Sequence, residues 1–135
     1  MKHIKLFRKA GEPTYTIPLS LCQHTRERLK LWQRLPLEDM HRELKQDIES
    51  LDRFEYLVMD DAGELQAMMV IDSDHNPHYG NYLYSRYSFS TENNLLSDGY
   101  KWMKQLCKSL SFDGLLLTRH TGTYEITSRF KPLSY

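Results

Sequence analysis

The sequence has little that marks a secreted, membrane-spanning or thiol-based protein. Its 135 residues include two cysteines, Cys22 and Cys107, which make neither a disulfide framework nor a CxxC site. No apolar run approaches the roughly 18–20 residues that a membrane span needs. The basic start has no apolar stretch behind it, so we expect no signal peptide. These absences predict a cytoplasmic protein with reduced thiols and no membrane association.

A surplus of one charge is also missing. Lys plus Arg and Asp plus Glu number 18 each, which gives a formal net charge of zero. Proteins that bind nucleic-acid phosphates usually carry a basic surplus, so we expect no nucleic-acid partner. The basic residues Arg26, Arg28, Lys30 and Arg34 are spread around one predicted helix, as on a solvated face. The length predicts one domain over residues 1–135.

Standard catalytic and metal-binding motifs are absent as well. The sequence has no HExxH helix, no Gly-x-Ser-x-Gly elbow and no Walker loop. The densest group of metal-type side chains lies in the segment Asp72-Ser73-Asp74-His75-Asn76-Pro77-His78. Carboxylates and imidazoles can hold Zn²⁺, Mn²⁺ or Fe²⁺, but this spacing matches no standard motif. A polar hairpin loop is the favoured interpretation, and we predict no metal.

Hydrophobic periodicity predicts the elements. Strands are expected over residues 2–7, 54–59, 65–71, 81–90 and 115–117, the last of them buried on both faces, and helices over 19–35, 37–51 and from 91–94 to about 111. Residues 72–80 are expected to form a loop, and the tail from 120 to 135 fits either a strand or a short helix. Gly99 lies inside a predicted helix, where it costs roughly 1 kcal/mol against alanine, so we expect a packing reason for it.

The order of these elements predicts an α+β fold in an α/β three-layer arrangement. Residues 54–59 and 65–71 would form an antiparallel hairpin. The strand–helix–strand unit from Tyr82 to Leu117 would form a right-handed parallel crossover. We therefore expect a mixed, mostly antiparallel central sheet with helices on both faces.

This order resembles the fold of the Gcn5-related N-acetyltransferases (GNAT), truncated after its fifth strand. The most family-like piece runs from Tyr84 to Phe130 and includes the helix with Gly99-Tyr100 and Trp102-Met103. It is similar to small acetyltransferase-like proteins encoded by tailed phages. The resemblance implies an acetyl-CoA-dependent transfer of an acetyl group to an amine of a small molecule or protein. A phage protein would act in the host cytoplasm or in the virion.

The resemblance also implies a place for acetyl-CoA. In the family, the strand that matches residues 82–90 splays from its parallel neighbour, here residues 115–118, and the pantetheine arm pairs with main chain in the gap. The pyrophosphate rests on N–H groups at the start of the next helix, here about residues 91–97. The implied acetyl-CoA-binding residues are Tyr87, Ser88, Phe89, Ser90, Asn93 and Asn94.

The candidate catalytic residues are His120, Tyr124 and Glu55. His120 follows a buried strand at its C-terminal end, which ligands favour in open sheets, and its imidazole suits a general base; the alternative is a histidine in a solvated loop. Tyr124 falls near the tyrosine that often protonates the CoA thiolate in the family. Glu55 is a further candidate base, and Arg119 could hold an anion.

The sequence departs from the family at the phosphate loop. The usual Gln or Arg followed by x-x-Gly-x-Gly/Ala is replaced by residues 90–99, which have no glycine pair. Glu92 and Asp98 add negative charge where phosphates would lie. The alternative hypothesis is therefore a scaffold without catalysis that serves as a virion component or binds and inhibits a host protein. Exposed aromatic residues of segment 79–87 would then supply the interface.

Overall fold

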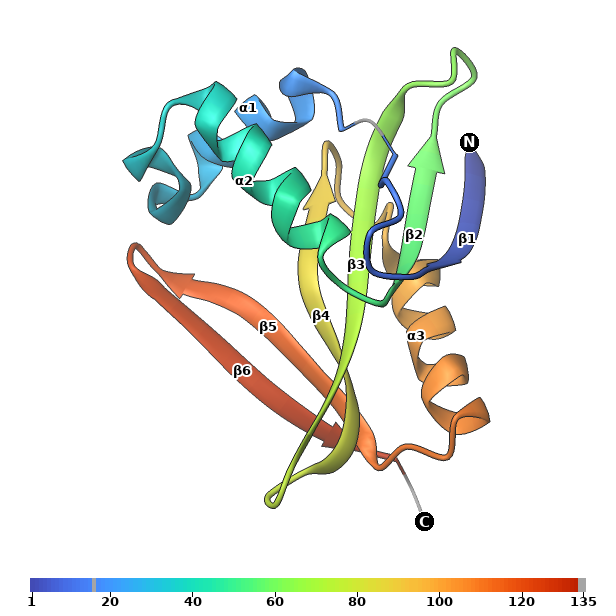
Figure 1. The fold of residues 1–135 in the computed structure, drawn as a ribbon. Coiled ribbons are helices and arrows are strands. Elements are labelled where there is room, and N and C mark those ends of the chain that lie inside the picture. Colours follow the sequence, from blue (N-terminus) through green and yellow to red (C-terminus); the bar gives the residue numbers. More distant parts are fainter. Residues whose placement is uncertain (16, 134–135) are drawn as a thin grey trace.

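A computed structural model describes residues 1–15 and 17–133 of the chain. The elements in order are β1 (Lys2–Arg8), α1 (Leu19–Arg28), the 3₁₀-helix η1 (Lys30–Arg34), α2 (Leu37–Glu49), β2 (Arg53–Met59), β3 (Leu65–Asn76), β4 (Gly80–Ser90), α3 (Ser97–Ser109), β5 (Gly114–Gly122) and β6 (Glu125–Pro132) (Figure 1). Within the described residues, no helix has the length and apolar character to cross a membrane.

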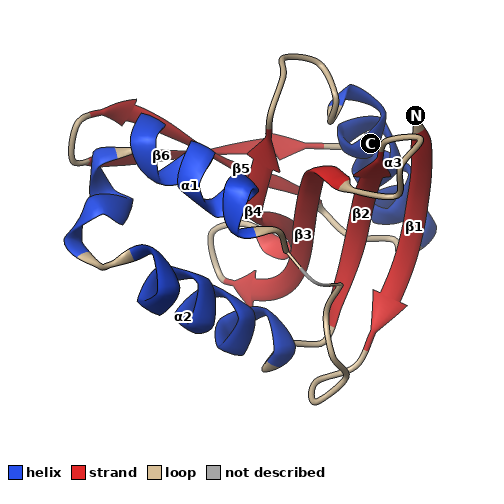
Figure 2. Cartoon of the chain, turned by 90° about the horizontal axis from the view of Figure 1, so that it is seen from above, coloured by secondary structure: helices blue, strands red, loops and turns tan. Residues whose placement is uncertain are grey.

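The strands form one sheet in sequence order, from β1 at one edge to β6 at the other. Every neighbouring pair is antiparallel except β4 and β5, which are parallel. Helices α1 and α2 cover one face of the sheet, and α3 covers the other (Figures 1 and 2). The expected α+β class, with a mixed, mostly antiparallel sheet and helices on both faces, is confirmed.

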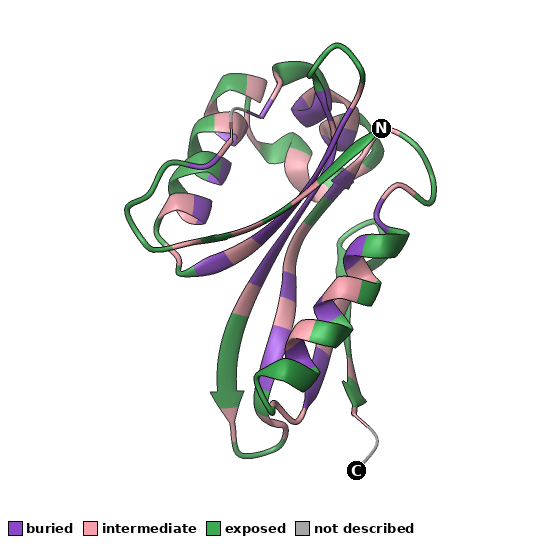
Figure 3. Ribbon diagram, turned by 90° about the vertical axis from the view of Figure 1, so that its right-hand side faces the viewer, coloured by how far each residue is buried: buried purple, intermediate pink, exposed green. Residues whose placement is uncertain are grey.

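Each face of the sheet has its own apolar core, and the buried positions gather on the central strands and the inner helix faces (Figure 3). On one face, Met40, Leu44 and Ile48 of α2 are fully buried, as the periodicity of this helix predicts. On the other face, α3 packs closely on β2. A Cβ added to Gly99 would lie 2.9 Å from the Tyr56 ring, which is the packing reason expected for this glycine.

Two predicted helices begin or end elsewhere than expected. The helix predicted over residues 19–35 breaks at Leu29, whose φ of −120° and ψ of 108° are extended. The helix predicted to begin at residues 91–94 begins later. Thr91 instead continues the sheet, because its N–H donates to Gln66 O at 3.0 Å, and Asn94 takes a left-handed φ of 68° that no helix continues through. Helix α3 therefore begins only at Ser97.

The strands are longer than predicted. Residues 72–76, expected to be a loop, extend β3 and pair with residues 80–84 of β4. Successive side chains of a strand point to opposite faces, so the polar side chains of residues 72–76 are divided between two faces. Among the described residues, no group of three or more His, Cys, Asp or Glu could hold a metal. Strand β5 runs from Gly114 to Gly122, and beyond Leu115 it is only half-buried or exposed, so the expected burial on both faces is wrong. The ambiguous tail forms strand β6.

A bulge in β4 positions the functional region. Val70 pairs with Tyr87 and Ile71 pairs with Ser85, so Arg86 is an extra residue in β4. A bulge bends its strand and redirects side chains. Arg86 and Tyr87 consequently both reach Asp47 of α2. The guanidinium donates to both carboxylate oxygens at 2.8 and 3.0 Å, and the Tyr87 hydroxyl donates at 2.5 Å.

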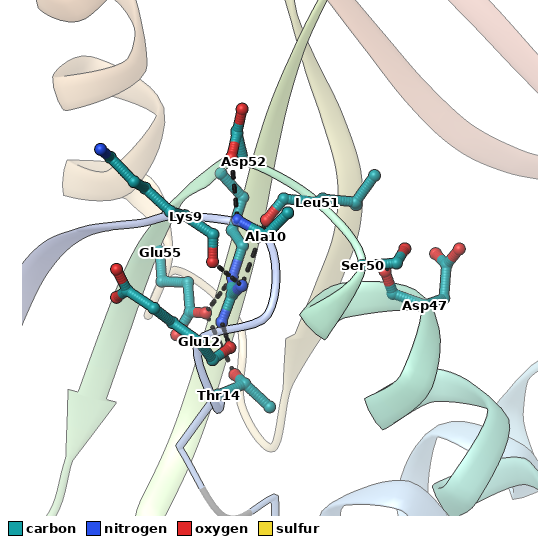
Figure 4. Close-up of polar contacts among 10 residues, drawn as sticks. Lys9, Ala10, Glu12, Thr14, Asp47, Ser50, Leu51, Asp52 and Glu55 are labelled. Atoms are coloured by element: carbon teal, nitrogen blue, oxygen red, sulfur yellow. Dashed lines mark hydrogen bonds and ion pairs between the residues drawn. The ribbon is translucent and has the colours of Figure 1, made fainter.

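A buried ion pair lies in β2, on the face of the sheet that α1 and α2 cover. The Arg53 Nε donates to Glu55 Oε2 at 2.8 Å, and both side chains are fully buried. The remaining guanidinium nitrogens donate to the main-chain oxygens of Lys9, Leu51 and Glu12 (Figure 4). The pair therefore fastens the segment after β1 to the start of β2.

We predict that Glu55→Gln lowers the free energy of unfolding by about 3–5 kcal/mol, because the buried Arg53 guanidinium then has no countercharge. Urea unfolding at pH 7 measures the change. The control is Arg42→Gln, which removes an exposed ion pair to Asp39 and is expected to change stability by less than about 0.5 kcal/mol. Equal losses in the two variants would contradict a structural role for the buried pair.

The contact between Asp47 and Arg86 makes stability depend on pH. Hydrogen bonds from Arg86 hold the pKa of the Asp47 carboxyl below its usual value. A carboxyl with a lowered pKa in the folded state stabilises the protein above the unfolded-state pKa of about 4, and this stabilisation is lost as the pH falls through the folded-state pKa.

We therefore predict that Asp47→Asn lowers the free energy of unfolding by about 1–2 kcal/mol at pH 7, since it weakens charge-assisted hydrogen bonds at a partly exposed site. The difference from the native protein should shrink at pH 3. Urea titrations at both pH values measure it. Asp39→Asn on the same helix is the control and should have a smaller effect. A difference that stays constant between the two pH values would refute this account of Asp47.

Candidate functional site

The site begins where the parallel pairing of β4 and β5 stops. The two strands pair only from Tyr82 with Gly114 to Tyr84 with Leu116, although both continue for six more residues. After these pairs the Thr118 hydroxyl donates to Ser85 O at 3.0 Å. Beyond this contact the strands diverge, and the hairpin of β5 and β6 leans away from the rest of the sheet (Figure 1). The splay that the resemblance implies is present.

Among the described residues, the divergence leaves main-chain groups of β4 without a strand partner. The Thr91 N–H donates toward β3, to Gln66 O. Successive residues of an antiparallel strand alternate in the edge to which their N–H and C=O point. The main-chain groups of Ser88 and Ser90 therefore point to the opposite edge, which is the side of the gap. Such an edge can pair with an extended amide-bearing ligand, as it would with another strand.

A cavity of about 410 Å³ lies at the end of β4, between α1 and the segment that connects β4 to α3. We call it the loop cavity. Its walls include Ser90, Asn93 and Asn94 on one side and His24 and Arg28 of α1 on the other. It is open to solvent and combines unpaired polar groups with basic side chains, which suits an anionic ligand.

The conformation of Asn94 compensates in part for the missing glycines. Its φ of 68° is left-handed, a conformation that asparagine tolerates better than most residues. Turns of this kind bring successive N–H groups together into an anion-binding concavity. The N–H groups of Asn93 and Asn94 have no acceptor among the described residues. Glu92 also lines the loop cavity, and its carboxylate opposes an anion there.

A second cavity, of about 440 Å³, lies in the gap itself and is bounded by η1, β4 and β5. We call it the gap cavity. Trp32 of η1 lies over β4, with its ring centroid 6.3 Å from those of Tyr87 and Phe89. Arg119 and His120 line the opposite wall from β5. The two cavities share Ser88 and Phe89, so one extended ligand could contact both.

The Tyr87 hydroxyl serves as a donor in this wall. Burial raises the pKa of the phenol well above its usual value, and the hydrogen bond to Asp47 raises it further. Tyr87 therefore stays protonated at neutral pH and keeps its bond to Asp47. Its ring, stacked on Phe89 at 5.9 Å between centroids, supplies an apolar surface.

The structure brings together most of the predicted site residues. The predicted acetyl-CoA-binding residues line the two cavities: Tyr87, Ser88 and Phe89 the gap cavity, and Ser88, Phe89, Ser90, Asn93 and Asn94 the loop cavity. His120 lines the gap cavity, but Tyr124 lies in the turn between β5 and β6, 72% exposed, and lines neither. Glu55 also lies outside both cavities, because its buried carboxylate is bound by Arg53 and Thr14.

Three residues of the site could not be predicted from a sequence motif. Asp47 belongs to the charged side of α2, and only its position next to buried Ile48 could have indicated a contact with the sheet. Trp32 lies within the stretch predicted as one continuous helix, and the break at Leu29 places it in η1, where it packs against the core of that face and also lines the gap cavity. Arg28 was assigned to a solvated face, and it lines the loop cavity.

No family model and no curated protein matches the sequence. Solved structures do resemble the fold. A possible acetyltransferase from Clostridium difficile 630 matches with a TM-score of 0.56 and 8% identity, over 90% of this chain and 82% of that one. A GNAT family acetyltransferase from Staphylococcus aureus subsp. aureus USA300_TCH1516 matches with a TM-score of 0.54 and 11% identity, over 100% of this chain and 98% of that one.

These likenesses are to the fold alone, because the identities are so low. The coverage of 98% of the Staphylococcus aureus chain gives no support to the expected truncation after the fifth strand. The similarity to phage-encoded proteins stays a prediction from the sequence. What the comparisons establish is that this chain has a GNAT-like acetyltransferase fold.

Proposed function

We propose that the chain is an acetyl-CoA-dependent N-acyltransferase that transfers an acetyl group to an amine. The observation that carries the proposal is the gap between β4 and β5, where main-chain groups of Ser88 and Ser90 lack a strand partner and two cavities adjoin. A fold hosts many functions, so the argument rests on this gap and its lining rather than on the likeness of the fold.

The residues of the two cavities fit acetyl-CoA in kind. The unpaired edge at Ser88 and Ser90 would pair with the amides of the pantetheine arm. The N–H groups of Asn93 and Asn94, with Arg28 opposite, would hold the phosphates. When bound, acetyl-CoA supplies a thioester: the amine nitrogen bonds to its carbonyl carbon, the C–S bond breaks, and the amine gives up a proton while the thiolate takes one.

His120 is the proposed base. It lines the gap cavity from β5, on the side where an acceptor amine would enter, and a neutral imidazole can take a proton near pH 7. Tyr124 and Glu55 are less suited, since neither lines the cavity. The contribution of the cavity itself is to hold the amine against the thioester in a fixed orientation, which lowers the entropic part of the barrier.

The second candidate function is a scaffold that binds a host or virion protein without catalysis. Glu92 favours it, because a carboxylate in the wall of the loop cavity repels phosphates. Substitution of Glu92 therefore helps to distinguish the transferase from the scaffold by experiment.

We predict that acetyl-CoA binds in the micromolar range, measured by calorimetry and by thermal shift. Ligand at a hundredfold excess over Kd should raise the stability by about 2.7 kcal/mol. Glu92→Gln should tighten binding about threefold to tenfold by removing a repulsive charge, and Arg28→Gln should weaken it by a similar factor. Ser90→Asp and Asn94→Glu should also weaken it, by adding a carboxylate.

Lys45→Gln is the matched control for these charge changes. Lys45 forms an exposed ion pair with Glu49 on α2 and lines neither cavity. Binding should be unchanged in this variant. The absence of any thermal shift at millimolar acetyl-CoA would overturn the enzymatic proposal and favour the scaffold.

We predict that His120→Gln lowers kcat about 10²- to 10⁴-fold in acetyl transfer to a panel of primary amines, because it removes the base. Release of free thiol measures the rate. Acetyl-CoA affinity should change far less than kcat, since His120 lines the gap cavity from β5 and not the β4 edge or the loop cavity that would bind the pantetheine arm and the phosphates. Tyr124→Phe is the control and should keep full activity. A loss of activity in Tyr124→Phe with none in His120→Gln would reverse the two assignments.

A further inference from the structure

The charges that line the gap cavity are of one sign. Arg34 of η1, Arg86 of β4 and Arg119 of β5 all line it, and no Asp or Glu within residues 1–15 and 17–133 does. The positive charge of Arg86 is balanced by two carboxylates. Its guanidinium donates two hydrogen bonds to Asp47, and Asp72 lies 3.6 Å from it. The two remaining arginines therefore set the charge of the cavity.

Arg34 and Arg119 have no side-chain partner within residues 1–15 and 17–133. Neither side chain makes a hydrogen bond or an ion pair with any residue that the structure describes. They come from two separate elements, η1 and β5, which bound the same cavity. A guanidinium binds carboxylate and phosphate through two parallel hydrogen bonds. Two unpaired guanidiniums around one cavity thus favour an anionic ligand over a cationic one.

Most of the remaining lining is aromatic or aliphatic, with Ser88, Thr118 and His120 as the polar exceptions. Trp32, Tyr87 and Phe89 form an aromatic wall, and Ile126 of β6 lines the cavity although 54% of it is exposed. Small-molecule sites combine such apolar walls with a few polar groups that fix orientation. Here the apolar wall would take the body of a ligand and the arginines its charged group.

We infer that the acceptor is a small primary amine that carries an anionic group, either carboxylate or phosphate-like, beside an aromatic or branched apolar body. The inference rests on the proposed function, since it names the acceptor class of that site. Polyamines and lysine-rich peptides are excluded as preferred acceptors, because they would meet guanidiniums and no carboxylate. The anionic group would also hold the amine in the cavity that His120 lines, since His120 and Arg119 both line it from β5.

The test measures acceptor binding directly, by calorimetry and by NMR titration without acetyl-CoA. The probes are L-phenylalanine, its carboxamide, its aminophosphonate analogue and spermidine. The first two share the amine and the ring and differ in the anionic group. We expect L-phenylalanine or the aminophosphonate to bind at least about tenfold more tightly than the carboxamide and spermidine, as a charge-assisted hydrogen bond would give. The ratio of the two anionic probes tells carboxylate from phosphate recognition.

Arg34→Gln and Arg119→Gln should each weaken binding of the anionic probe about tenfold and leave carboxamide binding unchanged. Both side chains are on the surface, so the variants should fold. Arg42→Gln, which removes an exposed arginine of α2 outside both cavities, is the matched control and should change nothing.

The outcomes separate this inference from the proposed function. Anion-selective binding that depends on Arg34 and Arg119, together with acetyl-CoA binding, supports the inference. The same selectivity without any acetyl-CoA binding leaves an anion-selective amine site, and it overturns the transferase proposal and the acceptor role with it. Acetyl-CoA binding without any preference for the anionic probes overturns the inference and keeps the transferase. The inference is also overturned if none of the anionic probes binds at 10 mM, or if the carboxamide binds as tightly as L-phenylalanine.

Discussion

The parallel pairing of β4 with β5 is the constraint on which the functional region depends. It lasts for three residue pairs and ends where Ser85 accepts a hydrogen bond from Thr118. If the parallel pairing continued, the N–H and C=O groups of Ser88 and Ser90 would form hydrogen bonds with β5, and no gap would exist. The bulge at Arg86 is what makes continuation difficult, because an extra residue in β4 shifts which main-chain groups reach the edge beside β5.

The bulge would be unfavourable without a partner for its side chain. Asp47 supplies that partner, and it binds Tyr87 as well, so one carboxylate on α2 holds two consecutive residues of β4. Helix α2 is in turn anchored by Met40, Leu44 and Ile48, which are fully buried. A chain of contacts therefore runs from the apolar face of α2 through Asp47 to Arg86 and Tyr87, and it fixes the distorted strand at the edge of the gap.

Much of this fold was predictable from the sequence, and much of the site was not. The apolar period of α2 and the strands on either side of Gly63 depend on local pattern, which a sequence displays directly. The start of α3 depends on whether Thr91 pairs with Gln66, and the role of Glu55 depends on whether Arg53 lies beside it in a buried setting. Both are contacts between segments, so local pattern pointed to the wrong helix start and to a catalytic role for a carboxylate that is structurally bound.

The two cavities differ in the charged side chains that line them, and we propose a different ligand for each. The loop cavity has Arg28 and His24 opposite Glu92, so its attraction for phosphates must come largely from the N–H groups around left-handed Asn94. A main-chain site of this kind depends little on the identity of its side chains, so the phosphate binding that we propose does not require glycines. The gap cavity is lined by Arg34 and Arg119, and no Asp or Glu of the described residues lines it, so its charge comes from side chains. Under the proposed function, substitutions at Arg34 or Arg119 would therefore change which acceptor is selected, whereas side-chain substitutions at the loop cavity would affect acetyl-CoA binding less.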